Sequence, residues 1–477
     1  MQSVPEGGTV TMAGKFNMTP TKVPMPERDP KERAKCFEEV AMGYTPEQAQ
    51  EEATRCLHCK AKPCVSGCPV GVPIPDFIAA VAAGDFLQAY DIIRTTNSLP
   101  AVCGRVCPQE KQCESKCIHL KMGKPAVAIG YLERFAADYE RESGNISIPE
   151  VAEKNGIKIA VVGSGPAGLS FAGDMAKRGY DVTVFEALHE IGGVLKYGIP
   201  EFRLPNKIVD VEIEGLRKMG VKFMTNCIVG KTISYDDLHA DGFKGIFAAS
   251  GAGLPNFMNI PGENLVGVMS SNEYLTRVNL MDAANPDSDT PVLQGKKVAV
   301  IGGGNTAMDS VRTARRLGAE RAMIVYRRSE EEMPARLEEV KHAKEEGVEF
   351  MTLHNPVEYL GDERGRVKQM RLQKMELGEP DASGRRRPVP VEGAIETIDV
   401  DEVIVSVGVS PNPLIPRAFQ GLEVSKKGTI VVNEENMRSA LPDVYAGGDI
   451  VRGGATVILA MGDGRKAAAA MDEALRG

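Results

Sequence analysis

Two glycine-rich units built on the same plan lie far apart in the chain, at 158–186 and 297–328, and they constrain its fold more than any other feature. In each unit, a short run of β-branched residues leads into a glycine-rich turn, which is followed by a helical pattern and a second short strand. This order of strand, turn and helix is typical of the βαβ unit that binds a dinucleotide. We therefore expect an α/β protein in which two dinucleotide-binding domains share one chain of 477 residues.

The first unit contains every part of a dinucleotide-binding fingerprint. Its turn reads Gly163-Ser-Gly165-Pro-Ala-Gly168, and its second strand ends in Glu186. Gly163 would make the tight turn, Gly165 would let backbone N–H groups approach a pyrophosphate, and Gly168 would allow the helix to pack closely on the strand. Glu186 would accept hydrogen bonds from ribose hydroxyls. A lone glycine motif is weak evidence, so this prediction depends on the strands, the helix and the terminal acid around it.

The second unit repeats this plan with a different ending. Its candidate cofactor-contacting residues are Gly302, Gly304, Asn305 and Thr306. Its second strand ends not in an acid but in Arg327 and Arg328. Two guanidinium groups suit a 2′-phosphate, because arginine binds phosphate through paired, charge-assisted hydrogen bonds. The sequence thus predicts a site that prefers NADPH to NADH, although these arginines could also simply end a solvated strand.

A third glycine segment, Val444-Tyr-Ala-Gly-Gly448-Asp449, lies near the end of the chain. A strand that ends this way can bring its backbone close to a ligand and point one carboxylate at a sugar-like hydroxyl. Together with the two units, this segment resembles the two-dinucleotide-domain flavoproteins of the disulfide-reductase-like class. The resemblance implies that the first unit and the late segment bind FAD together, with Asp449 on the ribityl chain. The FAD-binding residues implied are Gly163, Gly165, Gly168, Glu186, Gly193, Gly448 and Asp449.

The same resemblance implies a domain order. An FAD-binding domain is split between 151–285 and 400–477, and the NADPH-binding domain, 286–399, is inserted between its parts. Members of this class that reduce disulfides use a pair of redox cysteines near one of the dinucleotide units. This chain has only Cys227 after position 117, so disulfide reduction is excluded. Electrons that reach the flavin must leave by another route.

Eight of the ten cysteines lie in two short groups within the first 150 residues, which we expect to form a helical domain. They are Cys56, Cys59, Cys64, Cys68, Cys103, Cys107, Cys113 and Cys117. Thiolates at this density hold a soft, electron-rich metal centre, and the spacing is typical of iron–sulfur ligation. Structural zinc usually takes two C-x2-C pairs, and only Cys56 and Cys59 have that spacing. Disulfide scaffolds are short and cysteine-rich throughout, unlike this chain.

Composition excludes several classes of partner. The 57 basic and 65 acidic side chains give a net charge of −8, so no general attraction to nucleic acid or to an anionic membrane is expected. No apolar run approaches the ~18 residues that span a bilayer. The first residues, MQSVPEGGTV, have neither the basic nor the apolar region of a secretory leader, so we expect a cytoplasmic protein.

From about residue 25 onward, the chain resembles the glutamate synthase small (beta) subunit family, and within it most of all the large subunit of NADH-dependent ferredoxin:NADP oxidoreductase. The resemblance depends on the two cysteine segments, the first glycine fingerprint, YGIPEFRLP at 197–205 and YRRSEEEMPA at 326–335. It implies two [4Fe–4S] clusters with crossed ligation. One cluster would be held by Cys56, Cys59, Cys64 and Cys117, and the other by Cys68, Cys107, Cys113 and Glu133. Cys103 would remain unligated.

Two of the residues implied are less evident from the sequence itself. Glu133 lies on a probable helix among apolar residues, where it could be a metal ligand or an ordinary solvated glutamate. YGIPEFRLP is expected to form a loop over the flavin, with Arg203 as the candidate catalytic residue that places a positive charge near the isoalloxazine ring. The alternative for Arg203 is a surface arginine beside a turn.

The function implied is an NADPH-dependent FAD and iron–sulfur oxidoreductase subunit that passes electrons to a second flavoprotein subunit. We favour the electron-bifurcating enzyme that uses ferredoxin. The alternatives are the small subunit of NADPH-dependent glutamate synthase, a related sulfide- or sulfur-linked dehydrogenase, and a non-catalytic flavoprotein that senses redox state.

Overall fold

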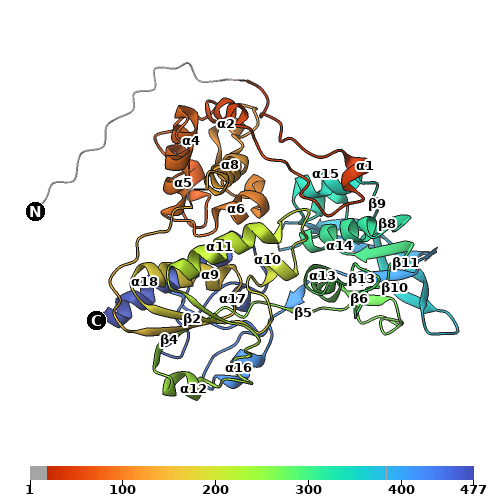
Figure 1. Cartoon of the computed structure of the whole chain (residues 1–477). Coiled ribbons are helices and arrows are strands. Elements are labelled where there is room, and N and C mark those ends of the chain that lie inside the picture. The colour runs from red at the N-terminus through yellow and green to blue at the C-terminus, as the bar shows by residue number, and fades with distance from the viewer. Residues whose placement is uncertain (1–18, 145, 383, 477) are drawn as a thin grey trace, which may run out of the picture.

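The computed structural model describes residues 19–144, 146–382 and 384–476, and it shows a helical N-terminal domain set against two α/β domains (Figure 1). Residues 1–18, which include those that bear on a leader, lie outside the described part. The architecture confirms the predicted fold class, an all-α N-terminal domain followed by two dinucleotide-binding domains. Across the described ranges, every helix is too short or too polar to cross a bilayer.

The N-terminal domain consists of short helices joined by loops that carry the cysteines. Its elements are α1 (Pro30–Arg33), α2 (Pro46–Ala53), α3 (Pro63–Ser66), α4 (Ile74–Ala83), α5 (Phe86–Arg94), α6 (Pro100–Val106), η1 (Gln109–Lys111), η2 (Glu114–Lys116), α7 (Ile118–Lys121) and α8 (Ile129–Glu142). Helix α2 begins at a proline after Thr45, whose side chain forms a capping box with Gln48. Helix α8 buries Leu132, Phe135 and Ala136 at helical spacing, and the Phe135 ring packs edge-on against Phe86 with ring centroids 4.9 Å apart.

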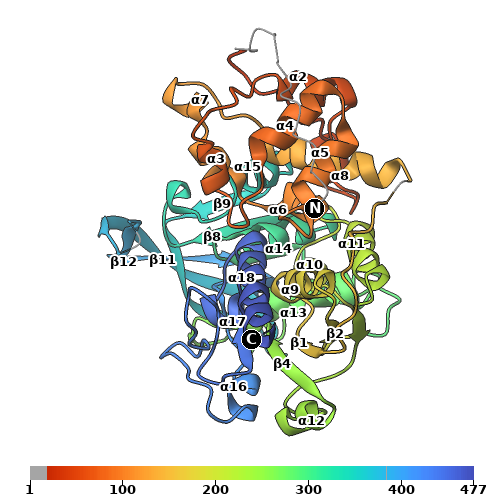
Figure 2. The same ribbon diagram turned by 90° about the vertical axis from the view of Figure 1, so that its left-hand side faces the viewer.

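The FAD-type domain is built on a five-stranded parallel sheet in the order β15-β4-β1-β2-β3. Its strands are β1 (Lys158–Val162), β2 (Asp181–Phe185), β3 (Lys222–Met224), β4 (Phe243–Ala248) and β15 (Val444–Ala446), and its helices are α9 (Pro166–Lys177), α10 (Val194–Tyr197), α11 (Asn206–Lys218), α12 (Tyr235–Ala240), α16 (Leu414–Ala418), α17 (Asp449–Arg452) and α18 (Val457–Arg476). Helices α9 and α18, which lie far apart in the sequence, pack side by side (Figure 2). Because the strands are parallel, their carboxyl ends share one edge.

The second α/β domain has its own parallel sheet in the order β6-β13-β7-β8-β9. Its elements are β6 (Val268–Ser270), α13 (Ser271–Leu280), β7 (Lys297–Ile301), α14 (Asn305–Arg316), β8 (Arg321–Tyr326), η3 (Glu330–Glu332), α15 (Leu337–Glu345), β9 (Glu349–Thr352) and β13 (Glu402–Val405). An antiparallel sheet of β10 (His354–Gly361), β11 (Val367–Pro380) and β12 (Arg386–Asp399) is attached to it. The sequence analysis did not anticipate this antiparallel sheet.

Strand pairing gives the second α/β domain wider limits than the predicted 286–399. β6 and β13 fall within the predicted FAD segments 151–285 and 400–477, yet both pair inside the second sheet. The paired strands extend from Val268 to Val405, and the short antiparallel pair β5 (Leu254–Pro255) and β14 (Val409–Ser410) marks where the chain enters and leaves. The physical reason is that the added strands extend the parallel ladder beyond β7, a pairing that local sequence patterns do not report.

Candidate redox site

One cavity of about 730 Å³ lies at the carboxyl edge of the first sheet and extends to the start of α14. The predicted residues that line it are Gly163, Gly165, Glu186, Gly193, Arg203, Asn305, Thr306, Gly448 and Asp449. Residues of both glycine-rich units therefore face one space, which is large enough for dinucleotide-sized ligands. The other predicted residues of the units, Gly168, Gly302, Gly304, Arg327 and Arg328, are not part of its lining.

The glycines of the first turn differ in what a side chain would meet. Gly163 has a φ of +104°, and a Cβ atom there would lie 2.4 Å from the carbonyl oxygen of Ala249. A Cβ atom at Gly168 would lie 2.1 Å from the carbonyl oxygen of Gly163, so this glycine serves the packing of helix on strand. A Cβ atom at Gly165 would meet nothing within 4 Å. The space next to the α-carbon of Gly165 is therefore not filled by protein atoms, and Gly165 lines the cavity.

Glu186 is held in place by its neighbours at the end of β2. One carboxylate oxygen accepts hydrogen bonds from the backbone N–H of Ser164 at 2.9 Å and from its hydroxyl at 2.5 Å. The other oxygen accepts from the backbone N–H of Leu188 at 2.9 Å. Sequence reasoning missed Ser164, which is fully buried and orients the acid predicted to meet the ribose.

Asp449 lines the same cavity from the first turn of α17. Its Oδ1 atom accepts a hydrogen bond from the backbone N–H of Ala455 at 2.9 Å, and burial raises the pKa of its carboxyl. Gly448, in front of it, has a φ of +75°, which favours glycine. The late segment thus brings one carboxylate to the cavity that the first glycine turn also lines.

The second glycine turn leads into α14 in the same way as the first leads into α9. Gly304 is the N-cap of α14 and Gly165 is the N-cap of α9, and neither helix has a side-chain cap. The first backbone N–H groups of both helices are therefore available to an anionic ligand. Asn305 and Thr306 face the cavity, and the Asn305 side chain accepts a hydrogen bond from the backbone N–H of Arg336 at 2.9 Å.

The two arginines after β8 have different surroundings. Arg327 is exposed and forms no ion pair with any described residue. Arg328 is buried, donates to a carboxylate oxygen of Asp381 at 2.8 Å and donates to the backbone carbonyl of Arg386 at 2.8 Å. Arg328 therefore fastens the antiparallel sheet to the end of β8, and Arg327 is the arginine that remains available to a phosphate.

The thiols in the N-terminal domain form two separate groups. Cys56, Cys59, Cys64 and Cys117 line one small cavity together with apolar side chains of α4 and α8. All four are partly exposed. Burial raises the pKa of Cys56 to about 12, and the neighbouring thiols add to the shift. The structure thus brings together the four cysteines predicted for one cluster, including Cys117, which is distant in sequence.

The second group contains Cys68, Cys107, Cys113 and Glu133. Burial raises the pKa values of the Cys68 and Cys113 thiols, a hydrogen bond with Cys103 together with burial raises that of Cys107, and the nearby Glu133 carboxylate adds to all three shifts. Glu133 is buried, and one of its carboxylate oxygens accepts a hydrogen bond from the side-chain amide of Asn97 at 2.7 Å. Burial raises the pKa of Glu133 to about 7. Glu133 is therefore not the solvated helix glutamate that the sequence also allowed.

The donor set and its spacing fit iron–sulfur clusters better than single ions. Zinc–sulfur bonds of about 2.3 Å in a tetrahedron place the sulfurs about 3.8 Å apart. Within the described ranges, the one group of three acidic, histidine or cysteine ligand atoms closer than 4.8 Å is Glu27, Glu338 and His342, none of them a cysteine. No three thiols of the described residues therefore lie as close together as the ligands of one tetrahedral ion.

Comparison with known proteins agrees with this division of the chain. A family model described as dihydropyrimidine dehydrogenase domain II, 4Fe-4S cluster, matches residues 33–145. A second model, pyridine nucleotide-disulphide oxidoreductase, matches residues 157–474. FprA from Mycobacterium tuberculosis in complex with NADPH has the same fold over 68% of this chain and 85% of its own, with a TM-score of 0.56 and 21% sequence identity.

Relatives that match this chain over nearly their whole length show the family to which it belongs. The glutamate synthase [NADPH] small chain of Halomonas elongata is 38% identical over 453 residues, which are 93% of this chain and 94% of that protein. The small chain of Escherichia coli is 36% identical and covers 94% of this chain and 96% of its own. The chain belongs to the glutamate synthase small-chain family. It is an NADPH-dependent flavin and iron–sulfur oxidoreductase, with FAD, NADPH and 4Fe–4S as its cofactors.

In this small-chain protein, the second thiol group adjoins the dinucleotide cavity. Val106 and Pro108, on either side of Cys107, are part of the cavity lining. Cys103 is fully buried one turn earlier on α6, and its sulfur lies 3.5 Å from the Met461 sulfur on α18. Local sequence patterns do not report the contact of Cys103 with Met461, because it joins segments more than 300 residues apart.

Arg203 lines the cavity, as the resemblance led us to expect, but its charge is balanced. Its guanidinium donates to both carboxylate oxygens of Asp309 at 2.6–2.7 Å, and its Nε lies 3.1 Å from Glu339. The two acids hold the pKa of Arg203 above its usual range, while burial raises the pKa of Asp309 to about 6. Arg203 is thus not the surface arginine that the sequence also allowed, and its role near the isoalloxazine stays a prediction.

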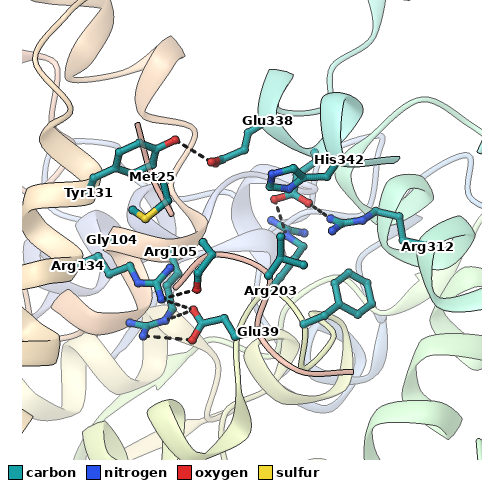
Figure 3. Close-up of a pocket in the computed structure, with 14 residues that line it drawn as sticks. Met25, Glu39, Gly104, Arg105, Tyr131, Arg134, Arg203, Arg312, Glu338 and His342 are labelled. Atoms are coloured by element: carbon teal, nitrogen blue, oxygen red, sulfur yellow. Dashed lines mark hydrogen bonds and ion pairs between the residues drawn. The ribbon is translucent and has the colours of Figure 1, made fainter. Parts of the chain in front are cut away.

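Arg203 also belongs to a joint between the helical domain and the second α/β domain (Figure 3). There, Tyr131 of α8 donates to Glu338 of α15 at 2.8 Å, and Arg105 of α6 pairs with Glu39 at 2.8 Å. The joint was not predicted, although two of its residues, Phe202 and Arg203, belong to the segment at 197–205 that contributes to the family resemblance.

Proposed function

We propose that the chain is the small (beta) subunit of an NADPH-dependent glutamate synthase, which supplies a larger partner subunit with electrons from NADPH. The observation that carries this proposal is the shared cavity. It is lined at once by the FAD-type turn, by Asn305 and Thr306 of the second turn, and by the residues that flank Cys107. A donor, a flavin and an electron acceptor can therefore meet without a large movement of domains.

The residues of the two turns bind and orient the dinucleotides. The N-terminus of α9, which begins after Gly165, takes the FAD pyrophosphate, and Glu186 and Asp449 accept hydrogen bonds from the sugar-like parts of FAD. The N-terminus of α14, which begins after Gly304, takes the pyrophosphate of NADPH, and Arg327 pairs with the 2′-phosphate. When bound, FAD takes two electrons from NADPH and releases them singly, which allows 4Fe–4S clusters to carry them.

Two clusters follow the flavin in this proposal. Cys68, Cys107, Cys113 and Glu133 hold the one next to the cavity, and Cys56, Cys59, Cys64 and Cys117 hold the other. The order follows from position, since the second group adjoins the FAD cavity while the first group is partly exposed. Electrons would enter beside Cys107 and leave through the partly exposed first group. Crossed ligation would assign Cys64 and Cys68, four residues apart in sequence, to different clusters.

The proposal also names the partner subunit and the final acceptor of the electrons. Relatives named glutamate synthase small chains, covered over 93–96% of their length, support this reading better than the ferredoxin-linked, electron-bifurcating enzyme that we favoured from the sequence. The Geobacter sulfurreducens NADPH-Fe(3+) oxidoreductase subunit beta is 37% identical to this chain, but the match covers only 62% of the length of that protein. The partner is a large subunit that completes glutamate formation, and the complex works in the cytoplasm, where thiols remain reduced.

An anaerobic purification with the native partner tests the proposal. We expect NADPH to bleach the flavin absorbance of the complex and to drive glutamate formation from glutamine and 2-oxoglutarate. NADPH-driven reduction of NAD and ferredoxin without glutamate formation would instead support the bifurcating enzyme. A flavin that NADPH does not bleach would indicate the redox sensor.

A further inference from the structure

The two segments that carry the first thiol group are basic, although the whole chain is acidic. Residues 56–66 and 114–124 contain five lysines and one acid, Glu114, against a net charge of −8 for the chain. Glu114 is buried and its carboxylate pairs with Lys22 at 2.5 Å, so it does not offset the lysines at the surface. Lys62 pairs with Asp76 at 2.9 Å, so the local positive charge over the first thiol group comes from the remaining exposed lysines, Lys60, Lys116 and Lys121.

Exposed apolar side chains accompany these lysines in the sequence. Lys60, Lys116 and Lys121 are exposed, and none of them forms an ion pair with a described residue. Leu120 and Met122, on either side of Lys121 in sequence, are 47% and 43% exposed. Exposed apolar side chains together with charged ones are typical of protein interfaces, where the polar rim remains in contact with water. We call this set of five residues the lysine surface.

The lysine surface lies where electrons would have to leave. Cys59 and Cys117 line the cavity of the first thiol group, and Lys60 and Lys116 are their neighbours in sequence. Figure 2 shows α3 and α7, which border this group, on the same outer side of the helical domain. By contrast, Cys107 and Cys113 of the second group are buried. A partner can thus approach the first group closely but not the second.

We propose that the lysine surface is the docking site for a redox partner protein whose contact face is acidic and holds its electron-accepting cofactor. This inference rests on the proposed function, since it requires electrons to reach the first thiol group. An acidic face is repelled by the overall charge of this chain and attracted by the lysine surface, so electrostatics select this one orientation for docking. Complexes of this kind bury little area and depend strongly on salt.

The test uses the full chain with its cofactors and two protein acceptors of opposite charge. An acidic flavodoxin is the probe, and basic mitochondrial cytochrome c is its counterpart. The test variant combines Lys60→Glu, Lys116→Glu and Lys121→Glu. The matched control combines Lys222→Glu, Lys244→Glu and Lys426→Glu, which are exposed lysines of the FAD-type domain and give the same change of charge. Ferricyanide, a small acceptor, reports whether the internal route is intact.

At low ionic strength we expect the test variant to reduce flavodoxin at least about tenfold more slowly than the parent does. The rate of the variant should also depend little on salt concentration. The same variant should reduce cytochrome c faster than the parent. Its ferricyanide rate, measured at high salt where the charge of this anion is screened, should not change, and the control should lose much less flavodoxin activity. Where the three glutamates lower the iron content, the corresponding Lys→Gln set replaces them, with a smaller effect in the same direction.

Equal losses in the test and control variants would overturn the docking site, because only overall charge would then matter. A parent protein that reduces ferricyanide rapidly but flavodoxin not at all would also overturn it. Failure of the proposed function looks different, since a parent that NADPH cannot bleach would reduce none of the acceptors.

Discussion

At the scale of single residues, Glu133 is the least conventional of the proposed cluster ligands. Asn97 donates to one of its carboxylate oxygens, and the Asn97 side-chain oxygen accepts from the backbone N–H of Leu99 at 2.9 Å. One oxygen of Glu133 is thus held by the protein, and the other is the oxygen that would bind iron in the proposed cluster. A buried carboxylate needs such partners, because an uncompensated one is costly in an apolar interior.

Replacing Glu133 by alanine should change the electron paramagnetic resonance signal of one reduced cluster and leave that of the other unchanged. The matched control is Glu140→Ala, because Glu140 is buried on the same helix and accepts from the backbone N–H of Ser147 at 2.7 Å, away from the thiols. Both variants should lose stability, but only Glu133→Ala should alter the spectrum. Identical spectra for the two variants would remove Glu133 from the ligand set.

The glycines of the first turn separate ligand binding from folding. Because a Cβ atom at Gly165 meets nothing in the protein, Gly165→Ala should fold normally and yet bind FAD at least tenfold more weakly. Because a Cβ atom at Gly168 would lie 2.1 Å from the Gly163 carbonyl, Gly168→Ala should lower stability by about 1–3 kcal/mol. Flavin fluorescence measures the first effect and urea unfolding of the apoprotein the second; a destabilised Gly165→Ala apoprotein would contradict the assignment.

At the scale of elements, the two arginines that follow β8 have different surroundings and different predicted roles. The sequence offers two arginines where a phosphate would bind. Arg328 donates hydrogen bonds to Asp381 and to the Arg386 carbonyl of the attached β10–β12 sheet, whereas Arg327 is exposed. We therefore predict that discrimination between NADPH and NADH depends on Arg327, and that the position of the antiparallel sheet depends on Arg328.

Arg327→Ala should therefore raise the KM for NADPH about tenfold or more, with little change in the KM for NADH, since one charge-assisted phosphate contact is lost. Arg328→Ala should lower the melting temperature and change the two KM values by similar factors. Steady-state kinetics with both nucleotides, together with thermal unfolding, distinguish the two variants. A selective loss of NADPH in Arg328→Ala would reverse the assignment.

At the scale of the whole molecule, a buried ion network holds the helical domain against the second α/β domain. Glu346, at the end of α15, accepts from Arg312 and Arg316 of α14 and from Arg33 of α1. These arginines hold the pKa of Glu346 at about 2, despite burial. The ring of Phe202, next to Arg203, stacks beneath the Arg316 guanidinium at 3.8 Å from the ring centroid. The network thus connects the domain joint to the cavity wall.

Replacing Glu346 by glutamine should cost about 3–5 kcal/mol, because it leaves buried arginines without a compensating charge. The matched control is Glu345→Gln, since Glu345 is next in sequence and pairs with the same Arg33, but is partly exposed; about 1 kcal/mol or less is expected there. Because the folded pKa of Glu346 is lower than its unfolded value of 4.5, its contribution is present above pH 4.5 and is lost as pH falls towards 2. Urea unfolding at pH 7 and pH 3 should therefore show the difference between the parent and Glu346→Gln shrinking at the lower pH.

What the sequence determined by itself is the local chemistry. A strand followed by Gly-x-Gly-x-x-Gly dictates its own backbone path and its own helix start, so both dinucleotide units could be predicted from short stretches of chain. Cysteine spacing likewise identified iron–sulfur ligation without a structure. These features depend on neighbours within a few residues, where dihedral preferences and side-chain reach settle the outcome.

Only the tertiary structure decided which distant groups share a space. Three features join segments that are tens to hundreds of residues apart. They are the approach of Cys117 to Cys56, the ion pair of Arg203 with Asp309, and the pairing of β6 and β13 in the second sheet. The residues beside Cys107 meet the flavin cavity for the same reason: packing of α6 against α18 is a product of the whole core. Local preferences carry no information on such contacts, since their energy comes from burial and charge pairing that exist only after the domains have come together.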